Sequence, residues 1–142
     1  MKSHTDLPQS KKLAEFLPIK SADMCFNTHN NMPPLMTPYS RFKEFYDMEP
    51  TPAFLIPCWS LAALMKLLPS EFTIKGEITY KIDIRKYALT DNVDIYQIAY
   101  GNYKWYEDGS RSWSDMINSG EREELIDACY DMIISLHEFK LL

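Results

Sequence analysis

The chain carries few residues whose type and spacing could support catalysis. Cys58 stands directly before a predicted helix, where the positive end of the helix dipole can lower the pKa of a thiol. A histidine would have to act as its base, but no sequence feature places His4, His29 or His137 beside it. Packing of Cys58 beside Trp59 is the simpler interpretation. A small enzyme that uses Cys58 or a carboxylate is kept as an alternative.

Two other groups of side chains could bind a metal or act as acids and bases. Cys25 and His29 stand four residues apart, a spacing at which two ligands can share a helix face, but no second ligand pair lies near them. Five acidic residues could supply paired carboxylates: Glu121, Glu123, Glu124, Asp127 and Asp131. Helix capping and solvation explain these acids better, since they lie in the first turn and on the polar side of the predicted helix. We therefore predict no catalytic residue, no metal site and no cofactor.

Six aromatic residues crowd into eighteen positions near the end of the predicted sheet. They are Tyr96, Tyr100, Tyr103, Trp105, Tyr106 and Trp113. Exposed rings on a sheet can bind a partner or stack on sugars and bases, but strands also favour aromatic residues for packing. Lys104 and Arg111 are the only basic residues among them, which weakens the nucleic-acid interpretation. The six rings form the candidate binding site.

Helical periodicity marks the elements that must carry these residues. Apolar residues recur every three or four positions over about 120–139, which predicts a helix with one buried face. They are Leu125, Cys129, Met132, Leu136 and Phe139. Ser119 is its expected N-cap. A second helix, over about 60–68, is expected to begin at Ser60, to end before Pro69 and to be buried, since it is apolar nearly all round.

Between these helices the apolar period changes to two. Alternation over 78–84 predicts a strand whose apolar face, including Ile78, Ile82 and Ile84, is covered by the helices. Further strands are expected at 72–75, 93–100 and 103–106, with a turn at 90–92, a turn or bulge at 101–102, a loop at 107–110 and one helical turn at 113–117. The predicted fold is α+β, with an antiparallel sheet of three or four strands packed on one face by the two helices.

Residues 1–57 are expected to form an irregular arm on a 58–142 core, within one domain of 142 residues. Asparagine and proline between residues 25 and 57 disfavour regular structure, while many apolar residues there disfavour disorder. Short helices are expected in three places, which are 11–17 with Ser10 as its cap, 21–24 and 40–47.

Charge and composition limit the class of protein. Residues 91–142 carry four basic and eleven acidic side chains, a net charge of −7, whereas binding to a phosphate backbone usually needs a basic stripe. No apolar run approaches the roughly 20 residues of a membrane span, and the first residues do not form a signal peptide. Three widely spaced cysteines are not a disulfide framework. We predict a cytoplasmic protein that binds neither membrane nor nucleic acid.

Several stretches together carry a resemblance. They are Gln9-Ser10-Lys11-Lys12-Leu13, Ser21-Ala22-Asp23-Met24, Pro57-Cys58-Trp59-Ser60-Leu61, Leu67-Leu68-Pro69 and Asp127-Ala128-Cys129-Tyr130-Asp131-Met132-Ile133-Ile134. The chain resembles a recurrent family of small uncharacterised proteins from Bacteroides-type gut bacteria and their prophages or mobile elements. That family has no assigned activity, so the resemblance implies a cytoplasmic accessory protein and transfers no functional residue.

The order of elements also looks like the double-stranded-RNA-binding fold and the related antitoxin-like fold, although fold alone does not imply function.

The leading hypothesis is a non-enzymatic protein that interacts with another protein or with itself. It would do so through its aromatic sheet or its acidic C-terminal face. The alternatives are the small enzyme and a nucleic-acid-associated regulator.

Overall fold

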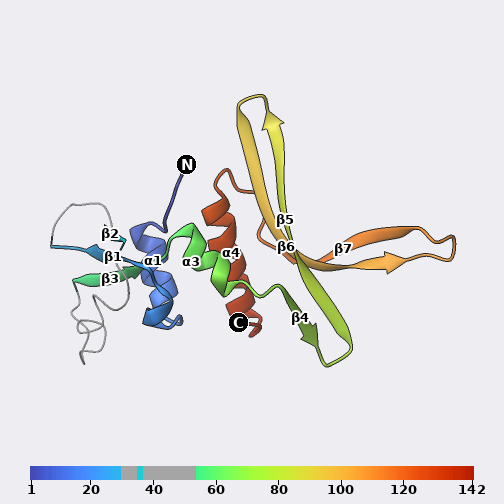
Figure 1. The fold of residues 1–142 in the computed structure, drawn as a ribbon, viewed down its shortest axis with the longest axis horizontal. Helices are drawn as coiled ribbons and strands as arrows, with labels where there is room; N and C mark the ends of the chain where they lie inside the picture. Colours follow the sequence, from blue (N-terminus) through green and yellow to red (C-terminus); the bar gives the residue numbers. More distant parts are fainter. Residues whose placement is uncertain (30–34, 37–53) are drawn as a thin grey trace. The chain divides into compact units, whose positions relative to one another are not determined.

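A computed structural model of the chain describes residues 1–29, 35–36 and 54–142 (Figure 1). The chain divides into two compact units, Met1–Leu67 and Leu68–Leu142. Its helices and antiparallel sheets confirm the predicted α+β class. The single domain with an arm ending at residue 57 stays a prediction. None of the helices in the described residues has the length and apolar character of a membrane span.

The first unit begins with helix α1, Leu7–Ala14. Asp6 caps it, because its carboxylate accepts a hydrogen bond from the Gln9 backbone N–H (2.9 Å) while the Gln9 side chain accepts one from the Asp6 N–H (3.1 Å). Pro8 lies in the first turn, where its missing N–H costs nothing. The prediction that Ser10 caps a helix over 11–17 is therefore wrong. Ser10 is a buried residue inside α1.

A small antiparallel sheet follows, in the order β2-β1-β3. Its strands are β1 (Met24–Asn27), β2 (Leu35–Met36) and β3 (Leu55–Cys58). Pro57 is tolerated because β3 is an edge strand. The segment predicted to be helical at 21–24 forms only a 3₁₀ turn over Ile19–Ser21, and Met24 already belongs to β1. The helix predicted at 40–47 lies outside the described residues.

Helix α3, Leu61–Leu67, starts where the sequence predicted. The Ser60 hydroxyl accepts a hydrogen bond from the Ala63 N–H (3.2 Å), which confirms its capping role. The Asp23 carboxylate in turn accepts hydrogen bonds from the Ser60 N–H (2.8 Å) and the Ser60 hydroxyl. This pairing fastens the start of α3 to the segment that precedes β1.

The second unit contains a four-stranded antiparallel sheet in the order β4-β5-β6-β7. The strands are β4 (Glu71–Ile74), β5 (Ile78–Thr90), β6 (Val93–Trp105) and β7 (Arg111–Asn118). The sequence placed two strands where β6 is continuous, because the register shift at Tyr100/Gly101 is a bulge and not a turn. The helical turn predicted at 113–117 is wrong, since those residues pair with β6 as part of β7.

The pairing pattern makes this sheet four strands wide only at its centre. β4 pairs with the first residues of β5, from Ile78 to Lys81, and β6 pairs with β5 from Lys81 onward. Beyond Gly101, among the described residues, β6 pairs only with β7. Three two-stranded arms therefore leave a shared centre in different directions, as Figure 1 shows. We call residues 101–115 the β6–β7 arm.

Helix α4, Leu125–Glu138, packs along β6. Cys129, Met132 and Leu136 of the predicted stripe are fully buried, as are Ile98 and Tyr100 of β6. The apolar face predicted on β5 is not covered as expected, since Ile78 is 46% and Ile84 41% exposed. The reason is that α4 follows β6, while both ends of β5 leave the centre within arms.

The start of α4 also differs from the prediction. Glu124 is its N-cap, five residues after Ser119. The Ser119 hydroxyl instead accepts a hydrogen bond from the Ile98 N–H (3.0 Å). Arg122 forms a two-hydrogen-bond bridge with Tyr96. These pairings hold residues 119–122 extended against β6, so the helix cannot begin before them.

Candidate binding surface on the β6–β7 arm

The structure separates the six predicted aromatic residues. Tyr100 is fully buried, its hydroxyl donates a hydrogen bond to the Pro69 carbonyl (2.6 Å), and burial raises its pKa. Tyr96 is half-buried on the β5–β6 arm, where the Lys86 ammonium lies 5.8 Å from its ring centroid. Tyr100 therefore has a structural role, and Tyr96 lies away from the other four rings in the sheet.

Three rings and one arginine share one face of the β6–β7 arm. Alternation along β6 puts Tyr103 and Trp105 on the same side, and their cross-strand partners are Trp113 and Arg111 respectively. Tyr103 and Trp113 meet edge to face, with centroids 5.2 Å apart. The Arg111 guanidinium carbon lies 4.1 Å from the Tyr103 centroid and 5.6 Å from that of Trp105. We call these four side chains the arm face.

The arm face is accessible to solvent. Tyr103 is 48% exposed, Trp105 is 66% exposed, and Trp113 is half-buried. Tyr106 is also exposed, but its hydroxyl hydrogen-bonds with Ser112 (3.0 Å), whose cross-strand partner is Lys104. Because Lys104 and Ser112 alternate away from the arm face, Tyr106 interacts with the opposite side of the arm.

The root of the arm depends on Gly101. A Cβ at this position would lie 2.2 Å from the Ser114 carbonyl oxygen and 2.9 Å from ring atoms of Trp113. The missing side chain therefore lets the Trp113 ring lie directly over β6. The indole N–H of Trp113 also donates a hydrogen bond to the Asp115 carboxylate (2.6 Å), which fixes the orientation of the ring.

Asp115 connects the arm to the centre of the sheet. Arg85 donates two hydrogen bonds to its two carboxylate oxygens, at 2.6 and 3.0 Å. Arg85 also binds Asp83 through Nε (2.7 Å) and the Gln97 side-chain oxygen through Nη1 (3.1 Å). The Arg85 hydrogen bonds hold the pKa of Asp115 below its ordinary value. One arginine thus joins β5, β6 and β7 at the root of the arm.

The tip of the arm is ordered by its own side chains. The Tyr106 N–H donates to the Ser110 carbonyl (2.9 Å). The Asp108 carboxylate accepts hydrogen bonds from both the N–H and the hydroxyl of Ser110, which lowers the pKa of Asp108. Gly109 takes the positive φ (82°) that such a turn requires. The loop predicted at 107–110 is confirmed, and it closes the arm as a tight hairpin.

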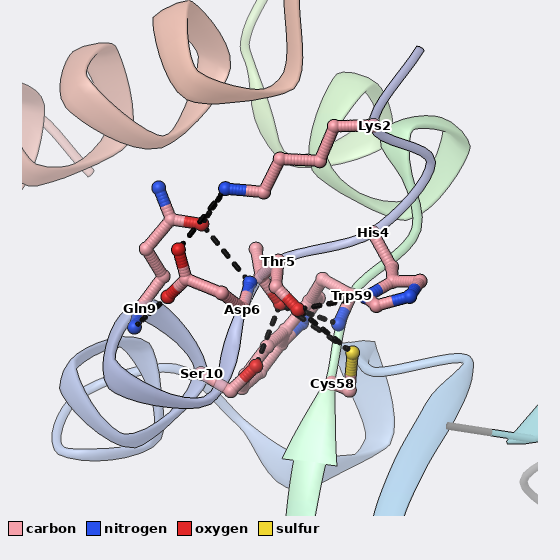
Figure 2. A network of polar contacts seen from close by, with 8 residues as sticks. All are labelled: Lys2, His4, Thr5, Asp6, Gln9, Ser10, Cys58 and Trp59. Atoms are coloured by element: carbon pink, nitrogen blue, oxygen red, sulfur yellow. Dashed lines mark hydrogen bonds and ion pairs between the residues drawn. The ribbon is translucent and has the colours of Figure 1, made fainter. Parts of the chain in front are cut away.

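Cys58 lies in a different environment from the one that catalysis would need. It belongs to β3 and is fully buried, and burial raises the pKa of its thiol. Figure 2 shows Cys58 within a network in which its sulfur lies 3.5 Å from the Thr5 hydroxyl. Thr5 also hydrogen-bonds with Ser10 (2.7 Å). A protonated, enclosed thiol fits the packing interpretation better than a nucleophile.

Two of the three histidines considered as a base for Cys58 have other neighbours. The His4 Nδ1 atom contacts the Thr5 carbonyl oxygen (2.9 Å), and the His29 ring stacks on Phe54 with centroids 4.2 Å apart. The Cys25 thiol donates a hydrogen bond to the Phe26 carbonyl oxygen (3.4 Å). In the described part of the chain, no group of three or more histidine, cysteine or acidic residues has an arrangement that could hold a metal ion.

Two of the acidic residues near α4 have separate partners. Glu121 accepts a hydrogen bond from the Tyr87 hydroxyl (2.5 Å), and Asp131 pairs with Arg122 Nε (2.5 Å). Both interactions hold residues 119–122 and their surroundings in place. They favour the structural interpretation of these carboxylates over paired acid–base catalysis.

Sequence reasoning missed the residues that organise the arm, namely Gly101, Arg85 and Asp115, and the stacking of Arg111. Assigning 113–117 to a strand would have revealed Arg111 and Trp113 as neighbours of Tyr103, because alternation then places all three on one face.

No protein-family model, curated protein or solved structure matches this chain. Function must therefore be inferred from the geometry of the chain itself.

Proposed function

We propose that the chain is a non-enzymatic protein-interaction module that binds another protein through the arm face. The observation that supports this proposal is the exposed stack of Tyr103, Trp105 and Arg111 on a projecting two-stranded arm. Tryptophan, tyrosine and arginine are the residue types that dominate binding energy at protein interfaces. Leaving such rings in water is unfavourable unless a partner covers them.

The local order of the arm supports the same conclusion. Aromatic side chains lose few rotatable bonds on binding, and pre-organised side chains lose less entropy than mobile ones. Here Trp113 is held by Asp115 and by its close approach to Gly101, while Arg111 is stacked on two rings. In the part of the chain that the structure describes, the strands of the arm also pair only with each other beyond Gly101, so either edge is open to a partner strand.

The alternative functions have less support. The second unit, residues 68–142, carries eight basic and fourteen acidic side chains, a net charge of −6, so a nucleic acid would be repelled. An enzyme using Cys58 would need an accessible thiolate, whereas this thiol is buried with a raised pKa. A role as a cytoplasmic accessory protein of a prophage or mobile element is proposed from the sequence resemblance, and three cysteines outside any disulfide fit a reducing compartment.

Affinity capture from the cells that make this protein tests the proposal. Wild-type chain, Trp105→Ala and Leu89→Ala would be compared as baits, followed by mass spectrometry. Leu89 is a matched control because it is 63% exposed but lies on the β5–β6 arm. We expect a partner that Leu89→Ala retains and Trp105→Ala loses. A partner retained equally by all three baits would contradict the proposal.

A further inference from the structure

Arg111 differs from the other arginines that the structure describes. Arg85 is paired with Asp115 and Asp83, and Arg122 is paired with Asp131. Within the described residues, Arg111 has no acidic partner and instead stacks on Tyr103 and Trp105. Its charge is therefore available to a ligand, whereas the charges of Arg85 and Arg122 are neutralised within the chain.

Stacking on two rings prepares this guanidinium for a planar acceptor. The rings restrict its orientation and shield its faces from water, while the N–H groups lie around its edge. A carboxylate offers two oxygens in one plane and can accept two parallel hydrogen bonds from that edge. Partial removal of water also strengthens such a charged pair.

The charges around Arg111 favour a single carboxylate over a phosphate or a polyanion. The loop at the tip contains Glu107 and Asp108, and Asp115 lies at the root, so the arm itself has more acidic than basic side chains. Lys104, the one other basic residue of the arm, alternates to the opposite face. A doubly charged phosphate would meet more repulsion here than a carboxylate carrying one charge.

We propose that Arg111, held between Tyr103 and Trp105, is the receptor for the carboxylate of an aspartate or glutamate side chain of the bound protein. This assignment rests on the proposed function, because it names the chemistry that the arm face recognises. The partner's acidic group would bind the guanidinium edge, and apolar groups beside that acid would cover the Trp105 ring.

Nuclear magnetic resonance of the arginine Nε–H groups tests the assignment on the full chain. The probes are a blocked Gly-Glu-Gly peptide, the matching Gly-Gln-Gly peptide and inorganic phosphate. At millimolar peptide, we expect the Glu peptide to shift the Arg111 signal several-fold more than the Arg122 signal, and the Gln peptide to shift neither. In wild type, the Glu peptide should also shift the indole N–H signal of Trp105. This shift should be lost in Arg111→Lys, because lysine lacks the planar pair of N–H donors that binds both carboxylate oxygens.

Three results would overturn the carboxylate assignment. They are equal responses to the Glu and Gln peptides, a larger response to phosphate than to the Glu peptide, and no response of Arg111 to any probe. Binding of the partner found by affinity capture then distinguishes a failure of this inference from a failure of the proposed function. Arg111→Gln should weaken its binding about tenfold or more. Wild-type binding by Arg111→Gln, with binding lost in Trp105→Ala, would refute the carboxylate receptor and leave the proposed function standing.

Discussion

Gly101 shows how much of the arm face depends on a single position. Its backbone approaches the Ser114 carbonyl and the Trp113 ring so closely that any side chain would collide with them. The bulge at Tyr100/Gly101 lies at the same point, where β6 leaves β5 and continues with β7 alone. The arm's direction and the placement of Trp113 are therefore coupled through one glycine.

We predict that Gly101→Ala lowers the free energy of unfolding by about 1–3 kcal/mol, because the added methyl group must displace backbone or an aromatic ring. Urea denaturation followed by tryptophan fluorescence would measure the change. Lys104→Ala, an exposed position on the same strand, should change stability by no more than about 0.5 kcal/mol. Equal effects of the two substitutions would show that the close contact at Gly101 is absent.

Buried ionisable groups in the core give the protein a specific response to alkali. Burial raises the pKa of Cys129 from 9.0 to about 12 and also raises that of Tyr100. In the unfolded chain Cys129 ionises near pH 9, while in the folded chain it stays protonated. Its contribution to stability is thus complete below pH 9 and is lost as the pH rises toward 12.

We predict that Cys129→Ala reduces the alkaline loss of stability by about 1.4 kcal/mol per pH unit between pH 9 and 12. Urea denaturation at several pH values would compare the two slopes. The variant should be less stable than wild type at neutral pH, because it leaves a small cavity. Parallel pH profiles in this range would contradict the burial of an unionised Cys129 thiol.

At the scale of elements, the Arg85–Asp115 pair holds the centre from which the arms leave. The side chains of Arg85 and Asp115 are 27% and 24% exposed, so solvent screens the pair only in part. The pair connects β5 to β7 across β6, and the same carboxylate orients Trp113. Loss of the charge on Asp115 should therefore weaken both the sheet centre and the root of the arm.

We predict that Asp115→Asn costs about 1–3 kcal/mol of stability near neutral pH, as expected for hydrogen bonds to a charged group. Because the folded pKa of Asp115 lies below its ordinary value of 3.8, the wild-type advantage should persist above that pH and disappear as the pH falls further. Asp83→Asn, whose side chain is 43% exposed, is the control and should cost less than about 1 kcal/mol. A pH-independent difference between wild type and Asp115→Asn would refute the role of the pair.

Periodicity predicted the elements better than their boundaries. The stripe at Cys129, Met132 and Leu136 identified α4, because its buried positions repeat with the helical period. The start of α4 was missed because residues 119–122 pair with β6, a long-range effect that local capping preferences do not report. The four-stranded sheet was within the predicted range, but β7 was mistaken for a helical turn.

The candidate site was predictable in composition but not in geometry. Crowding of aromatic residues drew attention to the right part of the sheet. It could not show that Tyr100 is buried while Tyr103 and Trp105 of the same strand are exposed, because the bulge and the divergence of the arms decide this. The stacking of Arg111 depends on which residues of β6 and β7 pair with each other. The apolar pattern of one strand does not reveal that register.

At the scale of the whole molecule, the chemistry divides between the two compact units. The first unit encloses one polar network, that of Thr5 and Ser10 beside Cys58 (Figure 2). The second unit presents the arm face on a strand pair that the rest of its sheet does not cover. We infer that recognition of a partner belongs to the second unit.

Site-specific photo-crosslinking in the cells that make the protein tests this inference most directly. Benzoylphenylalanine would replace Trp105, which keeps a large aromatic side chain in the arm face, and would replace the exposed control residue Leu89 in a second variant. We predict that irradiation crosslinks one discrete protein to position 105 and none to position 89. No adduct at position 105, or the same adducts at both positions, would contradict a protein-binding role for the arm face.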